Sequence, residues 1–265
     1  MDAAQESKDW VRYEVSGAVG SIVFARPKAN AYTRAFMEAF HAALDAAVAC
    51  ERSRVIVIRS ALERFFCAGA DIAAFSENDT ESNKLMVDLA RAALAKIEES
   101  SKLFVAALAG HALGGGLEIA MACDLRIAKE GSYQIGLPEV KLGLLPGNGG
   151  TQRLLRLVGA SKAMELMALG RNVHPAEAYA IGLVNRLYPE SEFEAKLQQD
   201  LETIAEGPPL TLAALKRSLQ EGRELSLLDG LALEARLVDS LYETEDAKEG
   251  FRAFCEKRSP NYTGR

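Results

Sequence analysis

The stretch HALGGGLEIAMACD, residues 111–124, places three consecutive glycines directly after an apolar run and directly before a segment of helical character. Glycine permits positive φ and lets the backbone approach a ligand closely, because it has no Cβ. If a helix begins at the glycines, its first N–H groups have no partner within the helix and point outward. We therefore expect a turn that presents backbone N–H groups, followed one helical turn later by Glu118 among apolar neighbours.

A second stretch, FFCAGADI at residues 65–72, has the same form. Both stretches are predicted to follow parallel strands, one ending near Ser60 and one near Ala109, at the sheet edge where open α/β folds bind ligands. One N–H from each turn would form an oxyanion hole, and the candidates are the amides of Ala70 and Gly115. The helix dipole also favours Gly115. A glycine run alone is more often a tight packing turn than a catalytic feature, so the pair of turns carries the prediction.

Two carboxylates accompany these turns. Glu118 is flanked by apolar residues, and Glu139 follows Pro138 in a segment rich in glycine and proline. If the fold brings the two together, burial and like-charge repulsion raise at least one pKa and leave one acid and one base near neutrality. The alternative for Glu139 is an exposed loop residue. His111, just before the glycines, is expected to serve packing or hydrogen bonding.

Composition excludes several classes of function. The 265 residues carry a formal net charge of −6, which gives no general attraction to nucleic acid or anionic lipid. Apolar runs are too short to span a bilayer, and the polar start, MDAAQESKDW, lacks the pattern of a secretory signal, so we expect a cytoplasmic protein. The four cysteines and three histidines are not at ligand spacing, and no metal site is predicted.

Hydrophobic periodicity predicts an α/β fold. A hairpin over residues 10–25, a helix over 33–49 and a strand over 54–60 form a βαβ unit, which repeats as a polar loop at 76–83, a helix at 84–98 and a strand at 103–109. A short helix from about Leu117 and strands near 124–128 and 132–135 follow. From Thr151 onward most segments are helical, with a break at Pro208 and Pro209. We expect a core over residues 1–200 and a helical region over 201–265.

Six motifs in order resemble the enoyl-CoA hydratase/isomerase (crotonase) family: RPKANAYT, FFCAGADI, GHALGGGLEIAMACD, LPEVKLGLLPGNGGTQRL, EAYAIGLVN and AFCEKRSPNY. The resemblance extends from about residue 10 to 262. It implies a crotonase-like spiral of repeated ββα units, followed by a C-terminal helical region that assembles trimers, commonly paired into hexamers. It also implies an acyl-CoA thioester as substrate, with CoA as part of the substrate and no separate cofactor.

The resemblance also implies roles for particular residues. The two oxyanion-hole amides of the family fall on Ala70 and Gly115, in agreement with the candidates above. By the same analogy, Glu118 orients and deprotonates water, Glu139 handles the proton at the α-carbon, and the amide of Gly147 helps to hold the water.

Further positions match family segments that contact CoA. Lys28 and Ala29 match the segment at the nucleotide end. Phe254 and Lys257 match positions near the CoA phosphate, offered by a neighbouring subunit, although a lysine on a terminal helix is ordinarily just solvated. The segment beside the adenine and pantetheine corresponds to Ala68, Gly69, Ala70, Asp71 and Ile72.

The two glutamates favour a hydratase acting in fatty-acid or branched-acyl breakdown. Isomerases of the family generally need only the carboxylate at the position of Glu139, so a double-bond isomerase is the alternative. Some relatives bind RNA through a lysine-rich helix, but residues 33–54 contain no lysine, which argues against this role. A non-catalytic CoA-binding protein would not need both glutamates. The sequence does not determine which acyl group the substrate carries. We expect a straight, short-chain enoyl-CoA, and a branched substrate such as 3-methylglutaconyl-CoA is the alternative.

Overall fold

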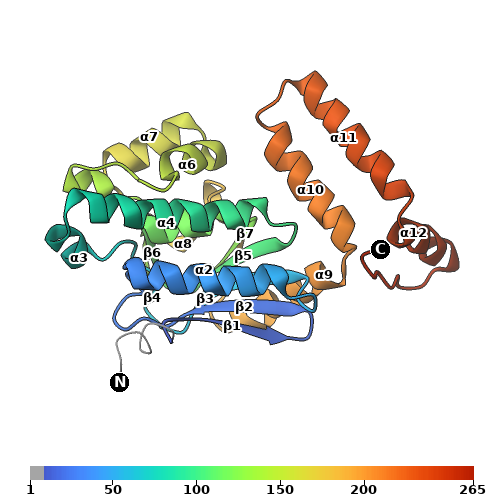
Figure 1. The fold of residues 1–265 in the computed structure, drawn as a ribbon, viewed down its shortest axis with the longest axis horizontal. Coiled ribbons are helices and arrows are strands. Elements are labelled where there is room, and N and C mark those ends of the chain that lie inside the picture. The colour runs from blue at the N-terminus through green and yellow to red at the C-terminus, as the bar shows by residue number, and fades with distance from the viewer. Residues whose placement is uncertain (1–8) are drawn as a thin grey trace.

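The computed structural model of the chain describes residues 9–265, and one six-stranded sheet forms its centre (Figure 1). The first two strands are antiparallel, as the predicted hairpin requires, and the remaining neighbours are parallel. The expectation of no secretory signal was based on residues 1–10, and residues 1–8 of that stretch lie outside the described residues. In order across the sheet, the strands are β1 (Val11–Ser16), β2 (Val19–Phe24), β3 (Val55–Ser60), β5 (Leu103–Leu108), β7 (Leu125–Lys129) and β9 (Arg186–Tyr188).

A second, smaller parallel sheet consists of β4 (Phe65–Cys67), β6 (His111–Leu113) and β8 (Ile135–Gly136). Each of its strands directly follows a strand of the large sheet and precedes helical structure, which confirms the repeated ββα units. The sequence prediction missed β4 and β6. Both glycine-rich turns therefore follow strands of the small sheet, and not the strands ending near Ser60 and Ala109 as predicted.

The helices between the strands are α2 (Arg34–Ala49), α3 (Ile72–Glu77), α4 (Thr80–Glu99) and α5 (Gly115–Ala122). In α2 the side chains of Phe36, Phe40 and Leu44 recur on one face and are buried against the large sheet. The predicted loop at 76–83 is wrong for most of its length, because α3 continues to Glu77 and α4 begins at Thr80. The side chain of Asp79 caps α4 by accepting a hydrogen bond from Ser82 N at 2.7 Å.

The next helices return the chain to the sheet. They are α6 (Gly150–Val158), α7 (Ala160–Ala168), α8 (Pro175–Ala180) and α9 (Phe193–Glu206). Phe193, Leu197 and Leu201 of α9 pack against Val55 and Val105 on the face of the sheet opposite to α2. The predicted boundary at residue 200 therefore falls within a helix that belongs to the sheet core. The change to protruding helices comes after Gly207, where Pro208 and Pro209 interrupt the chain.

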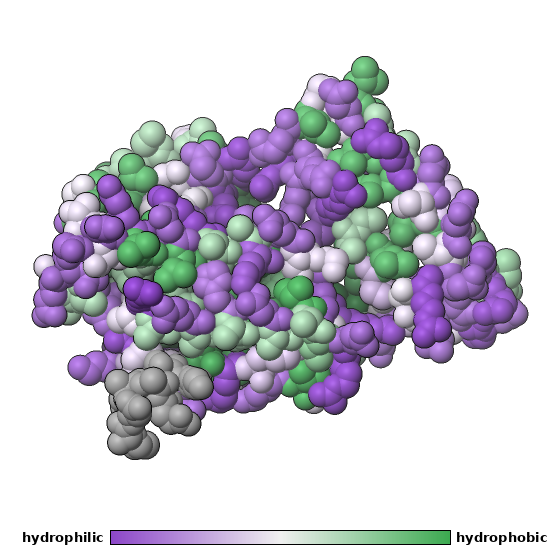
Figure 2. Space-filling model, in the orientation of Figure 1, coloured by the Kyte–Doolittle hydropathy of each residue, from purple (hydrophilic) through white to green (hydrophobic). Residues whose placement is uncertain are grey.

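The last three helices extend away from the sheets: α10 (Pro209–Gly222), α11 (Leu227–Tyr242) and α12 (Glu245–Glu256) (Figure 1). The buried ammonium of Lys216 fastens α10 to the core, donating to Ile97 O at 2.7 Å and to Asp124 Oδ2 at 3.0 Å. Apolar side chains remain on the surface of this region, as Figure 2 shows, and Leu227 of α11 is 81% exposed. Within residues 9–265, no helix combines the length and apolar character needed to cross a membrane.

Candidate active site

The two glycine-rich turns touch each other. Gly69 has φ +88°, and a Cβ at this position would lie 2.9 Å from Leu113 O and 3.0 Å from Gly115 N. Only glycine therefore fits this approach between the turn after β4 and the turn after β6.

Within residues 9–265, the amides of Ala70 and Gly115 take no part in the backbone hydrogen bonds that fix the two turns. Tyr32 pairs with the first turn through Tyr32 N to Gly69 O and Asp71 N to Tyr32 O, a pattern that does not use the amide of Ala70. Gly115 is the first residue of α5, so its N–H has no acceptor within the helix. The two segments that carry these amides therefore lie side by side, and the oxyanion hole they would form stays a prediction.

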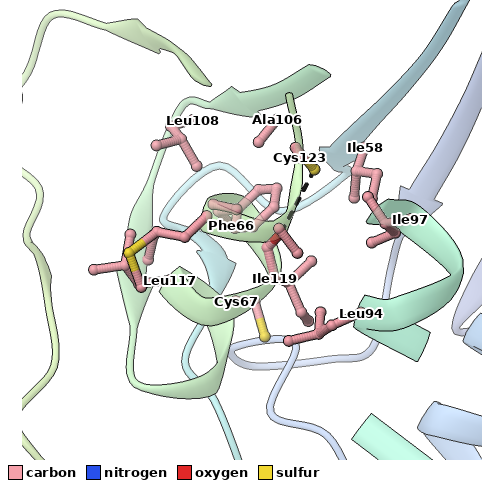
Figure 3. Packing of buried hydrophobic residues seen from close by; sticks show 14 of the residues in the cluster. Ile58, Phe66, Cys67, Leu94, Ile97, Ala106, Leu108, Leu117, Ile119 and Cys123 are labelled. Atoms are coloured by element: carbon pink, nitrogen blue, oxygen red, sulfur yellow. Dashed lines mark hydrogen bonds between the residues drawn. The ribbon is translucent and has the colours of Figure 1, made fainter. Parts of the chain in front are cut away.

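Helix α5, which begins at Gly115, is buried on all sides. Leu117 and Ile119 lie on different sides of the helix and belong to the same core cluster as Ile58, Phe66 and Leu94 (Figure 3). The helix starts two residues earlier than predicted, because the last two of the three glycines form its first turn. Its one charged side chain, Glu118, is therefore fixed to a rigid element.

Glu118 is 1% exposed and is held by backbone donors. Its Oε1 accepts hydrogen bonds from Asn148 N at 2.7 Å and from Gly150 N at 2.8 Å. Burial raises the pKa of Glu118, while these hydrogen bonds and the charge of Arg153 act in the opposite direction. The site therefore contains a buried carboxylate whose ionised form is supported by two N–H donors.

Glu139 is the first residue of a 3₁₀ helix, η1 (Glu139–Leu142), and its carboxyl reaches the glycine turn. A Cβ at Gly114 would lie 3.0 Å from Glu139 Oε1, and Glu139 Oε2 is buried without a hydrogen-bond partner within residues 9–265. Burial raises the pKa of Glu139 to about 7, and the charge of Glu118 adds to the shift. The alternative of an exposed loop residue is wrong, and the fold brings the two carboxyls together.

Three contact residues were missed by the sequence analysis. Asn148 and Gly150 hold Glu118 through their N–H groups, and Tyr32 places its hydroxyl 3.0 Å from Asn148 Nδ2. The only available signal was that Asn148 and Gly150 belong to the same PGNGG turn as Gly147. Gly147, chosen instead, accepts a hydrogen bond at its carbonyl from Arg91 Nε, so the role expected for its amide stays a prediction.

His111 lies in β6, directly before the glycine turn. Its Nδ1 accepts a hydrogen bond from Gln134 N at 3.0 Å, and its ring lies 4.9 Å from the ring of Phe65. Burial lowers the pKa of the imidazole. The prediction of a packing and hydrogen-bonding residue is confirmed.

A family model and curated relatives match most of this chain. The family model described as enoyl-CoA hydratase/isomerase matches residues 14–265. A probable enoyl-CoA hydratase of Bacillus subtilis is 40% identical over 93% of this chain and 95% of its own length. The chain belongs to the enoyl-CoA hydratase/isomerase family. It is therefore an enzyme, as the sequence predicts, and its α/β architecture is the crotonase fold.

Other members of the enoyl-CoA hydratase/isomerase family extend the comparison. The mitochondrial methylglutaconyl-CoA hydratase of Mus musculus is 35% identical over 89% of this chain and 76% of its own length. The crystal structure of an enoyl-CoA hydratase from Bacillus anthracis superposes with a TM-score of 0.93 at 34% identity, covering 97% of this chain and 100% of that chain. An acyl-CoA substrate fits this family.

Two of the segments expected to contact CoA in this family member lie together. Ala68 N donates to Ala29 O at 3.0 Å, which places the segment at Lys28 beside the one from Ala68 to Ile72. Lys28 is exposed with φ 75°, and Ile72 is exposed at the start of α3. The carboxylate of Asp71 is already engaged, since it caps α3 and pairs with Arg26 Nη2 at 2.9 Å.

Phe254 and Lys257 lie elsewhere. Phe254 is exposed on α12, and Lys257 follows at the end of that helix, at the opposite end of the chain's structure from β6 and α3 (Figure 1). Within one chain the structure does not bring these two residues to the glutamates. Their expected contact with CoA therefore depends on a second subunit and stays a prediction.

Proposed function

We propose that the chain is an enoyl-CoA hydratase, which adds water across the C2–C3 double bond of a 2-enoyl-CoA and gives a 3-hydroxyacyl-CoA. The observation that carries the proposal is that the buried Glu118 and the half-buried Glu139, whose charges interact, lie beside the turns that carry the amides of Ala70 and Gly115. Such an arrangement would supply a base, an acid and an oxyanion hole at one site.

The N–H groups of Ala70 and Gly115 would stabilise the charge that develops during the reaction. Attack of water at C3 of the conjugated thioester moves an electron pair toward the thioester oxygen, which becomes enolate-like. Two fixed donors aimed at that oxygen strengthen as the charge grows, and one such donor contributes about 3 kcal/mol to the transition state.

The carboxyls would move the protons. Glu118, supported in its ionised form by two N–H groups, takes a proton from water as the oxygen attacks C3. Glu139, whose pKa of about 7 keeps much of it protonated at neutral pH, delivers a proton to C2. We assign to the amide of Gly147 the holding of the attacking water.

The same proposal includes the contacts of the acyl-CoA. We assign the nucleotide end to Lys28 and Ala29, with Phe254 and Lys257 from a neighbouring subunit. The adenine and pantetheine would lie along Ala68–Ile72. Exposed apolar side chains on α11 and α12 support assembly into trimers or hexamers. Three expectations from the sequence stay predictions. The reaction would need no metal or redox cofactor, the protein would bind neither nucleic acid nor membrane, and it would act in the cytoplasm.

Steady-state assays test the reaction. Crotonyl-CoA should be hydrated, with loss of the absorbance of the conjugated thioester, faster than a 3-enoyl-CoA is converted to its 2-enoyl isomer. Faster double-bond migration, with hydration absent, would establish the isomerase alternative. A branched, carboxylated substrate belongs in the same series, because the mouse relative is named a methylglutaconyl-CoA hydratase.

A further inference from the structure

Tyr32 connects the two turns of the site. Its backbone pairs with the first turn, through Tyr32 N to Gly69 O at 2.8 Å and Asp71 N to Tyr32 O at 2.9 Å. Its side chain is 4% exposed and reaches the second turn, where a Cβ at Gly115 would overlap the hydroxyl oxygen. A single residue thus contacts both segments that carry the N–H donors.

The hydroxyl of Tyr32 also reaches the turn that holds Glu118. Asn148 Nδ2 donates to the Tyr32 hydroxyl at 3.0 Å, and Asn148 N donates to Glu118 Oε1 at 2.7 Å. Asn148 is itself buried, and its Oδ1 has no hydrogen-bond partner within the described residues 9–265. The contact with Tyr32 therefore restrains the donor end of the Asn148 amide, which also interacts with Glu118.

We propose that Tyr32 is a positioning residue for the hydration reaction: its hydroxyl fixes Asn148 and, through Asn148, the geometry of Glu118. This inference rests on the function proposed above. It adds Tyr32 to the residues of the site, with a hydroxyl that holds Asn148 and does not react with the substrate.

The charge around Glu118 decides the direction of the expected effect. Asn148 contributes both backbone and side-chain hydrogen bonds that lower the pKa of Glu118 against its burial. If Asn148 loses its contact with Tyr32, this support weakens and the pKa of Glu118 rises further. The other titratable or charged groups that face Glu118 or contact its helix include Glu139, Arg153 with its partner Glu98, Cys67, Cys123 and Arg126, and none of them is substituted in the variant.

The test compares Tyr32→Phe with a matched control. Tyr32→Phe keeps the ring and removes one neutral hydrogen bond, so we expect kcat to fall about tenfold with KM changed less than twofold. The acid limb of the kcat/KM profile should move to higher pH. Tyr133→Phe also removes a buried hydroxyl, which donates to Lys129 O at 2.7 Å and forms no hydrogen bond with Glu118, Glu139 or Asn148. This control variant should therefore lower only thermal stability.

A double-mutant cycle tests the route through Asn148. The double variant Tyr32→Phe/Asn148→Ala should lose no more activity than Asn148→Ala alone, because the two act in series. Additive losses would overturn this route. An unchanged kcat and pH profile in Tyr32→Phe, with only a lower Tm, would reduce Tyr32 to a structural residue and overturn the proposal.

A readout without substrate separates this inference from the proposed function. The pKa of Glu118 is followed by the chemical shift of its carboxyl carbon, assigned by its loss in Glu118→Gln. We expect the pKa to be higher in Tyr32→Phe than in the wild type and unchanged in Tyr133→Phe. An equal pKa in all three proteins contradicts the inference, while failure of the wild type to hydrate any enoyl-CoA contradicts the proposed function alone.

Discussion

The charge of Glu118 adds to the burial that raises the pKa of Glu139 to about 7. Because the two carboxyls interact, their protons leave in two steps that belong to the pair. Hydration needs the pair with one proton, since one carboxyl accepts a proton from water while the other gives one to C2. Dehydration of the product starts from the same total number of protons, with the proton on the other carboxyl.

We therefore expect a bell-shaped dependence of kcat/KM on pH, with an alkaline limb at about pH 7 where Glu139 loses its proton. Hydration of crotonyl-CoA and dehydration of 3-hydroxybutyryl-CoA should show the same two limbs. In Glu139→Gln the alkaline limb should vanish from the residual activity. Limbs that differ between the two directions would contradict a mechanism that uses one shared proton.

The raised pKa of Glu139 also predicts how stability depends on pH. Its pKa is higher in the folded chain than its ordinary value of 4.5, so the folded state loses stability from pH 4.5 upward, and the loss is complete above about pH 7. Glu139→Gln should therefore raise the free energy of unfolding at pH 8, by about 2 kcal/mol after allowing for partial exposure of the side chain. At pH 4 the variant and the wild type should be nearly equal. Urea unfolding at the two pH values measures this, and a larger gain at pH 4 would contradict it.

Gly116 tests the packing of α5 against β4. A Cβ at this position would overlap Cys67 O and lie 2.7 Å from Cys67 C, and these backbone atoms cannot rotate away. Gly116→Ala should destabilise the fold by about 3 kcal/mol. Gly222→Ala, at a position where a Cβ would meet nothing within 4 Å, should change stability by less than about 0.5 kcal/mol. Equal Tm values for the two variants would contradict this account of the turn.

The exposed apolar residues of the C-terminal helices predict a self-association surface. Leu227 and Leu228 on α11 and Phe254 on α12 are 81%, 77% and 86% exposed, which is unusual for a group of large apolar side chains on a monomer. Sedimentation should give the mass of a trimer or hexamer for the wild type. Serine at all three positions should lower that mass, while Val48→Ser, an exposed position on α2, should not. A monomeric wild type would contradict the prediction.

The pattern of apolar residues predicted several of the buried helices and strands. The helix α2 follows from apolar residues at helical spacing, and the buried strands β3 and β5 follow from runs of consecutive apolar residues. The glycines with Glu118 predicted a turn and a buried carboxylate. The three-residue strands β4 and β6 were missed because they are too short to show alternation, and their hydrogen-bonding partners lie far away in the sequence.

The partners of the carboxyls were beyond sequence reasoning for a different reason. Glu118 is held by the backbone N–H groups of Asn148 and Gly150, which every residue except proline possesses. The meeting of Glu118 with Glu139 likewise depends on the small sheet, which brings β6 beside β8. The residue types predicted Glu118 and Glu139 as candidates, but only the fold shows that the two side chains lie close to each other.

The most direct test of the central claim is the steady-state hydration of crotonyl-CoA by the wild type, Glu118→Gln and Glu139→Gln. Glutamine preserves the size of each side chain but cannot exchange a proton as a carboxyl does. The account predicts that each substitution lowers kcat by a factor of at least about 100 while CoA binding changes little. Near-normal hydration by either variant would contradict the two-carboxylate mechanism.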